Sequence, residues 1–181
     1  LKQYIYVFKH KQILENKKNL GNLSTISEAF QKCFLGDKNT DSYFSNLIND
    51  SKADYTRYTF FYLSYLVENN RIDDALRITK DINYLNSTLL LSQGKNWVEN
   101  KNIDKFTNLF SCKNSNDLIG EFLFLIANLY SSQENYEKSN FYLNLSVFFN
   151  RKFSFNLSLS ASNYFVKKDY QQVKKILKNF K

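Results

Sequence analysis

Apolar and polar residues follow one another along this chain with the period of a helix. Apolar side chains recur three and four positions apart, for example at Phe141, Leu145 and Phe148. Such intervals place side chains on one face of an α-helix, whereas a half-buried strand would alternate at every second residue. Short polar segments at 131–135 and 167–169 interrupt the apolar stretches. The pattern therefore predicts pairs of helices that are joined by short loops.

These pairs predict an all-α protein, built as a single helical-repeat domain of about five antiparallel helical hairpins. The expected hairpins span residues 22–50, 54–83, 86–112, 117–150 and 153–180, and a leading helix spans residues 1–18. The chain contains only 4 Gly and no Pro. So few turn-forming residues argue against an all-β sandwich or barrel, which needs many tight turns.

A self-similarity with a period of 34 residues runs through the C-terminal part of the chain. The matching pairs are Ala127 and Ala161, Tyr130 and Tyr164, Tyr136 and Tyr170, and Leu143 and Leu177. Gly94 precedes Ala127 by nearly the same interval. A small residue lets two helices approach closely, so we expect Gly94, Ala127 and Ala161 at equivalent helix crossings.

This pattern resembles the tetratricopeptide repeat (TPR), a helix–turn–helix unit of 34 residues with a small residue in its first helix. The resemblance covers residues 54–181 and is clearest in the last three units, although the proline that closes the family's motif is absent. It implies an α-solenoid, a right-handed superhelix that binds partner segments on its concave face. In its Lys- and Asn-rich style the chain is also similar to uncharacterised repeat proteins of A/T-rich alphaproteobacteria, which implies a bacterial origin.

The first helix of each hairpin lines the concave face of such a solenoid, and the phase of the repeat selects candidate partner-binding residues. They are Leu91, Lys95, Val98, Glu121, Phe124, Asn128, Ser131, Phe155, Ser158, Ser162 and Phe165. Apolar anchors among small polar groups suit a peptide or helical segment of a partner protein. The alternative for Phe124 and Phe155 is packing against neighbouring helices. The predicted function is a non-enzymatic protein–protein interaction scaffold.

The net positive charge of the chain suggests an alternative function, that of a basic helical-repeat protein that binds nucleic acid. The net charge is +8, of which residues 1–20 carry +4, residues 21–150 carry −3 and residues 151–181 carry +7. A groove that follows a nucleic-acid backbone needs cations along its whole length, so this distribution disfavours nucleic acid. The basic C-terminal helix is the only segment suited to membrane contact, and the plainer interpretation packs its apolar stripe against the preceding hairpin.

Sequence motifs for catalysis are missing. His10 is the only histidine and no glycine-rich phosphate loop occurs, so no enzyme activity, cofactor or metal is expected. Cys33 and Cys112 lack the short spacing of a metal or redox motif and are expected as buried thiols. No apolar run approaches the length of a membrane span, so a soluble protein of the cytoplasm or periplasm is expected. The absence of Met predicts a processed chain, or a segment of a longer protein with further repeats.

Overall fold

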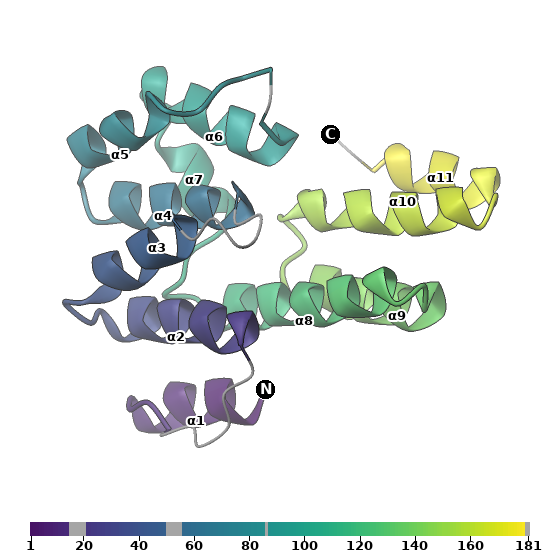
Figure 1. Cartoon of the computed structure of the whole chain (residues 1–181), viewed down its shortest axis with the longest axis horizontal. Coiled ribbons are helices and arrows are strands. Elements are labelled where there is room, and N and C mark those ends of the chain that lie inside the picture. Colours follow the sequence, from purple (N-terminus) through teal and green to yellow (C-terminus); the bar gives the residue numbers. More distant parts are fainter. Residues whose placement is uncertain (15–20, 50–55, 86, 180–181) are drawn as a thin grey trace. The chain divides into compact units, whose positions relative to one another are not determined.

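The computed structural model of the protein describes residues 1–14, 21–49, 56–85 and 87–179. Within these ranges the chain forms eleven α-helices, one short 3-10 helix and no strand, so the all-α prediction is confirmed (Figure 1). The helices are α1 (Lys2–His10), α2 (Asn22–Leu35), α3 (Thr40–Ile48), α4 (Thr56–Glu68), α5 (Ile72–Thr79), α6 (Leu89–Glu99), α7 (Asp104–Leu109), α8 (Ser115–Ser132), α9 (Tyr136–Phe149), η1 (Ser154–Asn156), α10 (Leu157–Val166) and α11 (Tyr170–Leu177).

The chain divides into two compact units. Unit 1 is Leu1–Ser115 and contains α1 to α7. Unit 2 is Asn116–Lys181 and contains the part of α8 that follows Ser115, together with α9, η1, α10 and α11. Two consecutive α-helices fall in each expected hairpin range, from α2 and α3 in the first to α10 and α11 in the last, although α8 begins at Ser115, before the start of the range 117–150. The leading range contains α1, and its residues 15–18 lie outside the described part of the chain, as do the ends of several hairpin ranges.

The five hairpins share one kind of turn. In each hairpin a residue with left-handed backbone, at φ between 58° and 65°, follows the first helix: Gly36, Asn70, Lys101, Glu134 and Lys168. The next residue donates its backbone N–H to the carbonyl five positions earlier, at 2.9 Å for Asp169 and Tyr164. This bond satisfies a carbonyl that the helix end leaves unpaired. Because successive left-handed residues are 31 to 34 positions apart, the turns recur with nearly the period of the sequence pattern.

Aromatic side chains fill the core of unit 1. Phe30 of α2, Phe61 of α4 and Phe110, which follows α7, meet with their ring centroids 4.4 to 5.9 Å apart. Gly94 of α6 lies against Phe60 of α4, and a Cβ atom at Gly94 would stand 2.9 Å from Phe60 Cδ2. A larger side chain at Gly94 would push α6 away from α4, so a glycine at this position permits the close packing of the two helices.

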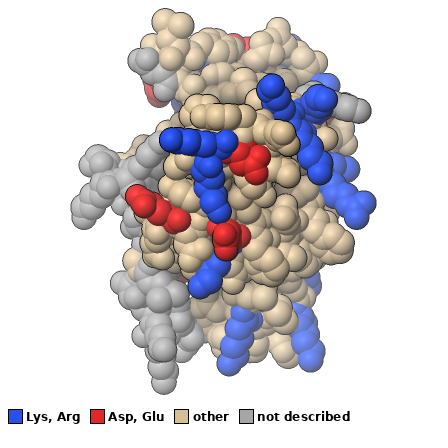
Figure 2. All heavy atoms as spheres, turned by 90° about the vertical axis from the view of Figure 1, so that its right-hand side faces the viewer, with Lys and Arg blue, Asp and Glu red and all other residues tan. Residues whose placement is uncertain are grey.

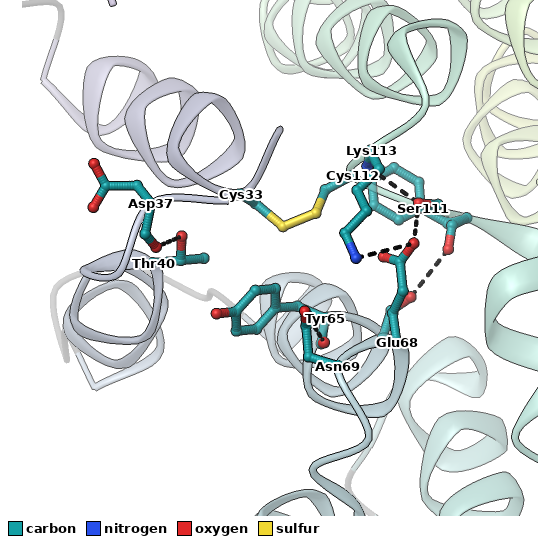
Figure 3. The surroundings of a disulfide bond; sticks show 11 residues. Cys33, Asp37, Thr40, Tyr65, Glu68, Asn69, Ser111, Cys112 and Lys113 are labelled. Carbon is teal, nitrogen blue, oxygen red and sulfur yellow. Dashed lines mark hydrogen bonds and ion pairs between the residues drawn. A yellow bond between two sulfur atoms is a disulfide. The ribbon is translucent and has the colours of Figure 1, made fainter. Parts of the chain in front are cut away.

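A disulfide joins Cys33 of α2 to Cys112, which follows α7, so the expectation of buried free thiols is wrong (Figure 3). The two Cα atoms are 5.8 Å apart, an ordinary separation for a disulfide. Beside the disulfide, the Ser111 hydroxyl donates a hydrogen bond of 2.7 Å to the Glu68 carboxylate of α4, which also lies 4.0 Å from Lys113 Nζ. Sequence spacing could not identify the pair, because only the fold brings together segments that are 79 residues apart.

Reduction of the disulfide should destabilise unit 1. Closing a loop of 79 residues restricts the unfolded chain, and the loss of the bond should lower the free energy of unfolding by about 4 kcal/mol. Trp97 is the only tryptophan and lies in α6 of unit 1, so its fluorescence during urea unfolding, with and without a reductant, measures the effect. A Cys33→Ser/Cys112→Ser variant should have the unfolding midpoint of the reduced protein, and the reductant should not change that midpoint. Equal unfolding midpoints for oxidised and reduced wild type would contradict the prediction.

Candidate interaction surface

The candidate residues of unit 1 are engaged within α6 and its neighbours. Leu91 and Val98 are buried in the core, which corrects their assignment to a partner-binding surface. Lys95 is largely buried as well, because its ammonium group donates a hydrogen bond of 2.7 Å to the Ile82 carbonyl and lies 3.7 Å from the Glu99 carboxylate.

The candidate residues of unit 2 divide into an inner and an outer group. Glu121 is buried in α8, and the Ser131 hydroxyl donates a hydrogen bond of 2.7 Å to Asn163 Oδ1, so both side chains take part in internal packing. Phe124 of α8 and Phe155 of η1 are half-buried. The outer group lies on α8 and α10 and consists of the exposed residues Asn128, Ser158, Ser162 and Phe165.

Helix α9 is turned so that its apolar face is outside. Phe141 and Phe148 are 58% and 63% exposed, and Leu145 between them is half-buried. The buried face of the same helix carries the polar residues Ser139, Asn140 and Ser146 together with Leu143. Large exposed apolar side chains next to one another are characteristic of interaction sites. We call Phe141, Leu145 and Phe148 the outer face of α9.

A network of buried hydrogen bonds holds α9 in this orientation. Asn163 of α10 donates from its amide nitrogen to Ser139 Oγ at 2.8 Å and to Asn140 Oδ1 at 3.1 Å, while its oxygen accepts the Ser131 bond. Ser160 of α10 donates to Asn140 Oδ1 at 3.2 Å. We call these five residues the polar seam. Buried polar groups need such partners, so the seam fixes which face of α9 meets α10.

A second contact repeats the same chemistry at the other end of α9. The Ser146 hydroxyl donates a hydrogen bond of 2.7 Å to the Gly120 carbonyl of α8 and accepts one of 2.7 Å from the Asn156 amide. A Cβ atom at Gly120 would lie 3.2 Å from the Ser146 carbonyl oxygen, so α8 and α9 cross closely there. Ser146 is fully buried, and the orientation of α9 is thus held by polar contacts at both ends.

The sequence did not identify the outer face of α9 as a surface. Its apolar spacing predicted a helix, and apolar residues at such intervals normally face a core. The signal that could have identified it lies on the opposite side of the helix, where Ser139, Asn140 and Ser146 form an equally regular polar stripe. Which of two such stripes is inside depends on the partners that α8 and α10 supply, and no single helix reveals them.

A surface cavity of about 640 Å³ lies in unit 1, lined by side chains of α3, α4, α5 and the start of α6, including Leu91. Three of its four charged lining residues take part in ion pairs. Arg71 lies 2.5 Å from Asp41 and 2.6 Å from Asp74, and Asp74 also contacts Arg77. Hydrogen bonds to Asp41 and then to Asp74 raise the pKa of the Arg71 guanidinium. The fourth charged lining residue is Asp81, and both arginines of the lining are thus engaged by carboxylates rather than free for an anionic ligand.

Comparison of the chain with protein-family models, with curated proteins and with solved structures finds no match. Among the described residues, no group of three or more His, Cys, Asp or Glu side chains is placed to hold a metal ion. In the same part of the chain, no helix combines the length and apolar character needed to cross a bilayer. The outer face of α9 and the exposed residues of α8 and α10 are the surfaces of unit 2 considered for a protein partner.

Replacement of Asn163 by Leu should destabilise unit 2. The variant removes all three amide hydrogen bonds and leaves the buried Ser139 hydroxyl without its donor and the Ser131 hydroxyl without its acceptor, which should cost about 2–3 kcal/mol of unfolding free energy. Urea unfolding followed by far-UV circular dichroism measures the loss, and Trp97 fluorescence reports separately on unit 1. The matched control is Asn144→Leu, an exposed position of α9, which should change stability by less than about 0.5 kcal/mol. Equal effects of the two substitutions would show that the seam does not contribute.

Proposed function

We propose that this protein is a non-enzymatic scaffold of TPR-like hairpins, stacked as a right-handed solenoid, that binds a segment of a partner protein through unit 2. Three features support the repeat architecture: the common turn of the five hairpins, the close approach of Gly94 to Phe60, and the burial of Ala127 and Ala161. Stacked hairpins bury a shared core and leave long helix surfaces free, which suits binding by many modest contacts.

The observation that carries the proposal is the orientation of α9, which buries polar residues and exposes its apolar face. Phe141 and Phe148 lie seven residues apart, two helical turns, and both project their rings from one side of the helix together with Leu145. A partner helix that places apolar residues at the same intervals could pack along this face. Aromatic side chains are the usual anchors of protein interfaces, because each buries a large area at low cost in conformational entropy.

The exposed residues of α8 and α10 form a second candidate surface, and all four belong to the set that the repeat phase predicted. Asn128, Ser158 and Ser162 offer polar groups and Phe165 an apolar one. Small polar side chains between apolar anchors can hydrogen-bond the backbone of an extended segment. The two surfaces lie on different helices, so variants of one leave the other intact.

Substitution of the aromatic anchors should abolish partner capture without unfolding the protein. Phe141→Ser/Phe148→Ser removes apolar groups that are already more than half exposed, so the free energy of unfolding should change by less than about 1 kcal/mol. Partners captured from the organism that makes the protein, and identified by mass spectrometry, should be lost by at least about tenfold. Leu85→Ser/Leu89→Ser in unit 1 removes two exposed apolar side chains of similar character and is the control.

A second variant, Ser162→Arg/Phe165→Ser, tests the surface on α8 and α10 in the same assay. Loss of the partner in this variant alone would place the contact on the first helices of the hairpins. Retention by both variant pairs would contradict the proposal. Capture that disappears in all samples, control included, when the salt concentration is raised would instead favour the alternative of a nucleic-acid-binding protein.

We infer that the protein works in an oxidising compartment. Of the two expected locations, the cytoplasm and the periplasm, this inference favours the periplasm. The disulfide supports this inference, because cytosolic thiols are normally kept reduced and structural disulfides persist in exported proteins. An alkylating reagent that adds mass to free thiols, applied to intact cells, should leave Cys33 and Cys112 unmodified until a reductant is added. Modification of both cysteines without a reductant would place the protein in a reducing compartment.

A further inference from the structure

The C-terminal hairpin exposes an apolar edge. Helix α11 buries none of its side chains, although α10 packs beside it. Tyr170 and Leu177 lie two helical turns apart on one side of α11, and the ring of Phe165 contacts that of Tyr170 at a centroid distance of 5.7 Å. These three residues and Val166 are each more than half exposed. We call them the C-terminal edge. Within the described part of α11, Val173 and Ile176 of the apolar stripe are half-buried and Leu177 is exposed, so the expected packing on the preceding hairpin is incomplete there; Phe180 lies outside the described residues.

Lysines surround this edge, and most have no acidic partner. They are Lys167, Lys168, Lys174, Lys175 and Lys178, all exposed. Lys167 pairs with Glu137 at 3.3 Å, and no ion pair joins the other four to a described acidic residue. Asp169 is the only acidic residue between 151 and 181, and its carboxylate accepts the Gln172 backbone N–H as the cap of α11. In the view of Figure 2, Lys and Arg side chains are more prominent than Asp and Glu.

We propose that the C-terminal edge and its lysines bind the surface of an anionic lipid bilayer. Aromatic and aliphatic side chains such as Phe165, Tyr170 and Leu177 can enter the boundary between headgroups and acyl chains, while neighbouring lysines reach the anionic headgroups. A lysine side chain suits this task, because its apolar stem lies along the membrane boundary and its ammonium group reaches water. The contact is peripheral and does not depend on the outer face of α9.

The kind of cation distinguishes a bilayer from an acidic protein segment. Arginine is the residue that holds a carboxylate in a fixed, two-pronged geometry, whereas lysine is a flexible point charge. Between 152 and 181 every basic residue is a lysine. Unpaired lysines on long stems can follow anions whose positions are not fixed, as in a fluid headgroup layer. The four apolar side chains form a narrow edge rather than a groove, which fits shallow insertion better than the docking of a helix.

The test is co-sedimentation of the chain with two kinds of vesicle, one of equimolar phosphatidylglycerol and phosphatidylcholine and one of phosphatidylcholine alone. Wild type should bind the anionic vesicles at least about tenfold more tightly than the neutral ones, and Lys174→Glu/Lys178→Glu should lower that affinity by at least about tenfold. The control Lys80→Glu/Lys105→Glu changes the net charge equally at exposed positions of unit 1 and should have less than about a twofold effect.

The apolar part is tested at high salt, where the headgroup attraction is screened. Tyr170→Ser/Leu177→Ser should lower the remaining binding to anionic vesicles severalfold, while Leu85→Ser/Leu89→Ser should leave it unchanged. Far-UV circular dichroism confirms that each variant is folded, and the lysine variants decide the result if the serine pair loses helix. Equal binding to both vesicles, equal effects of the two lysine pairs, or binding to polyglutamate without binding to vesicles would overturn the proposal.

Discussion

Hydrogen bonding of buried side chains at the crossing of α9 and α10 determines how unit 2 is assembled. Asn163 is buried, and its amide finds three partners only if α9 presents Ser139 and Asn140 to it. Turning α9 to bury Phe141 and Phe148 would gain apolar burial, but it would carry Ser139 and Asn140 to the solvent side. The Asn163 amide and the Ser160 hydroxyl of α10 would then remain buried without these partners. The penalty for several unsatisfied groups is comparable to what two aromatic side chains gain by burial. The exposed aromatic face is therefore a consequence of the polar seam.

The two units solve the problem of stability in different ways. Unit 1 packs the rings of Phe30 in α2, Phe61 in α4 and Phe110 after α7 into one cluster. Its disulfide joins α2 to the segment that follows α7. Its surface ion pairs, such as that of Arg71 with Asp41, add little, because exposed pairs are screened by water. Unit 2 contains no cysteine and places polar groups where unit 1 places rings. Apolar side chains that unit 2 leaves outside remain available for binding.

Local patterns were sufficient to predict an all-α chain, but not the direction in which each helix faces. The hairpin turns lie where polar loops interrupt apolar stretches, and Gly94 sits at a close crossing because its neighbour Phe60 needs the space. The repeat phase assigned Leu91 and Val98 to the concave surface, but both are buried. The phase cannot distinguish the apolar residues of a helix that face the core from those that face a partner. The disulfide was missed for a related reason. Contacts between residues far apart in the chain follow from tertiary packing, and the spacing of the two cysteines in the sequence does not reveal them.

Binding and folding should be linked in unit 2. The unit spans only Asn116–Lys181, and a domain of this size buries a smaller share of its surface on folding than a larger domain does. Here part of the interior is used for amide and hydroxyl groups, while Phe141 and Phe148 face outward. A partner that covers these rings supplies the missing apolar burial, and anything that binds only the folded state stabilises it by mass action. The lysine-rich C-terminal edge carries a different chemistry on α10 and α11, so a protein on the outer face of α9 and a bilayer need not compete for the same residues, although the α8 and α10 surface shares Phe165 with this edge.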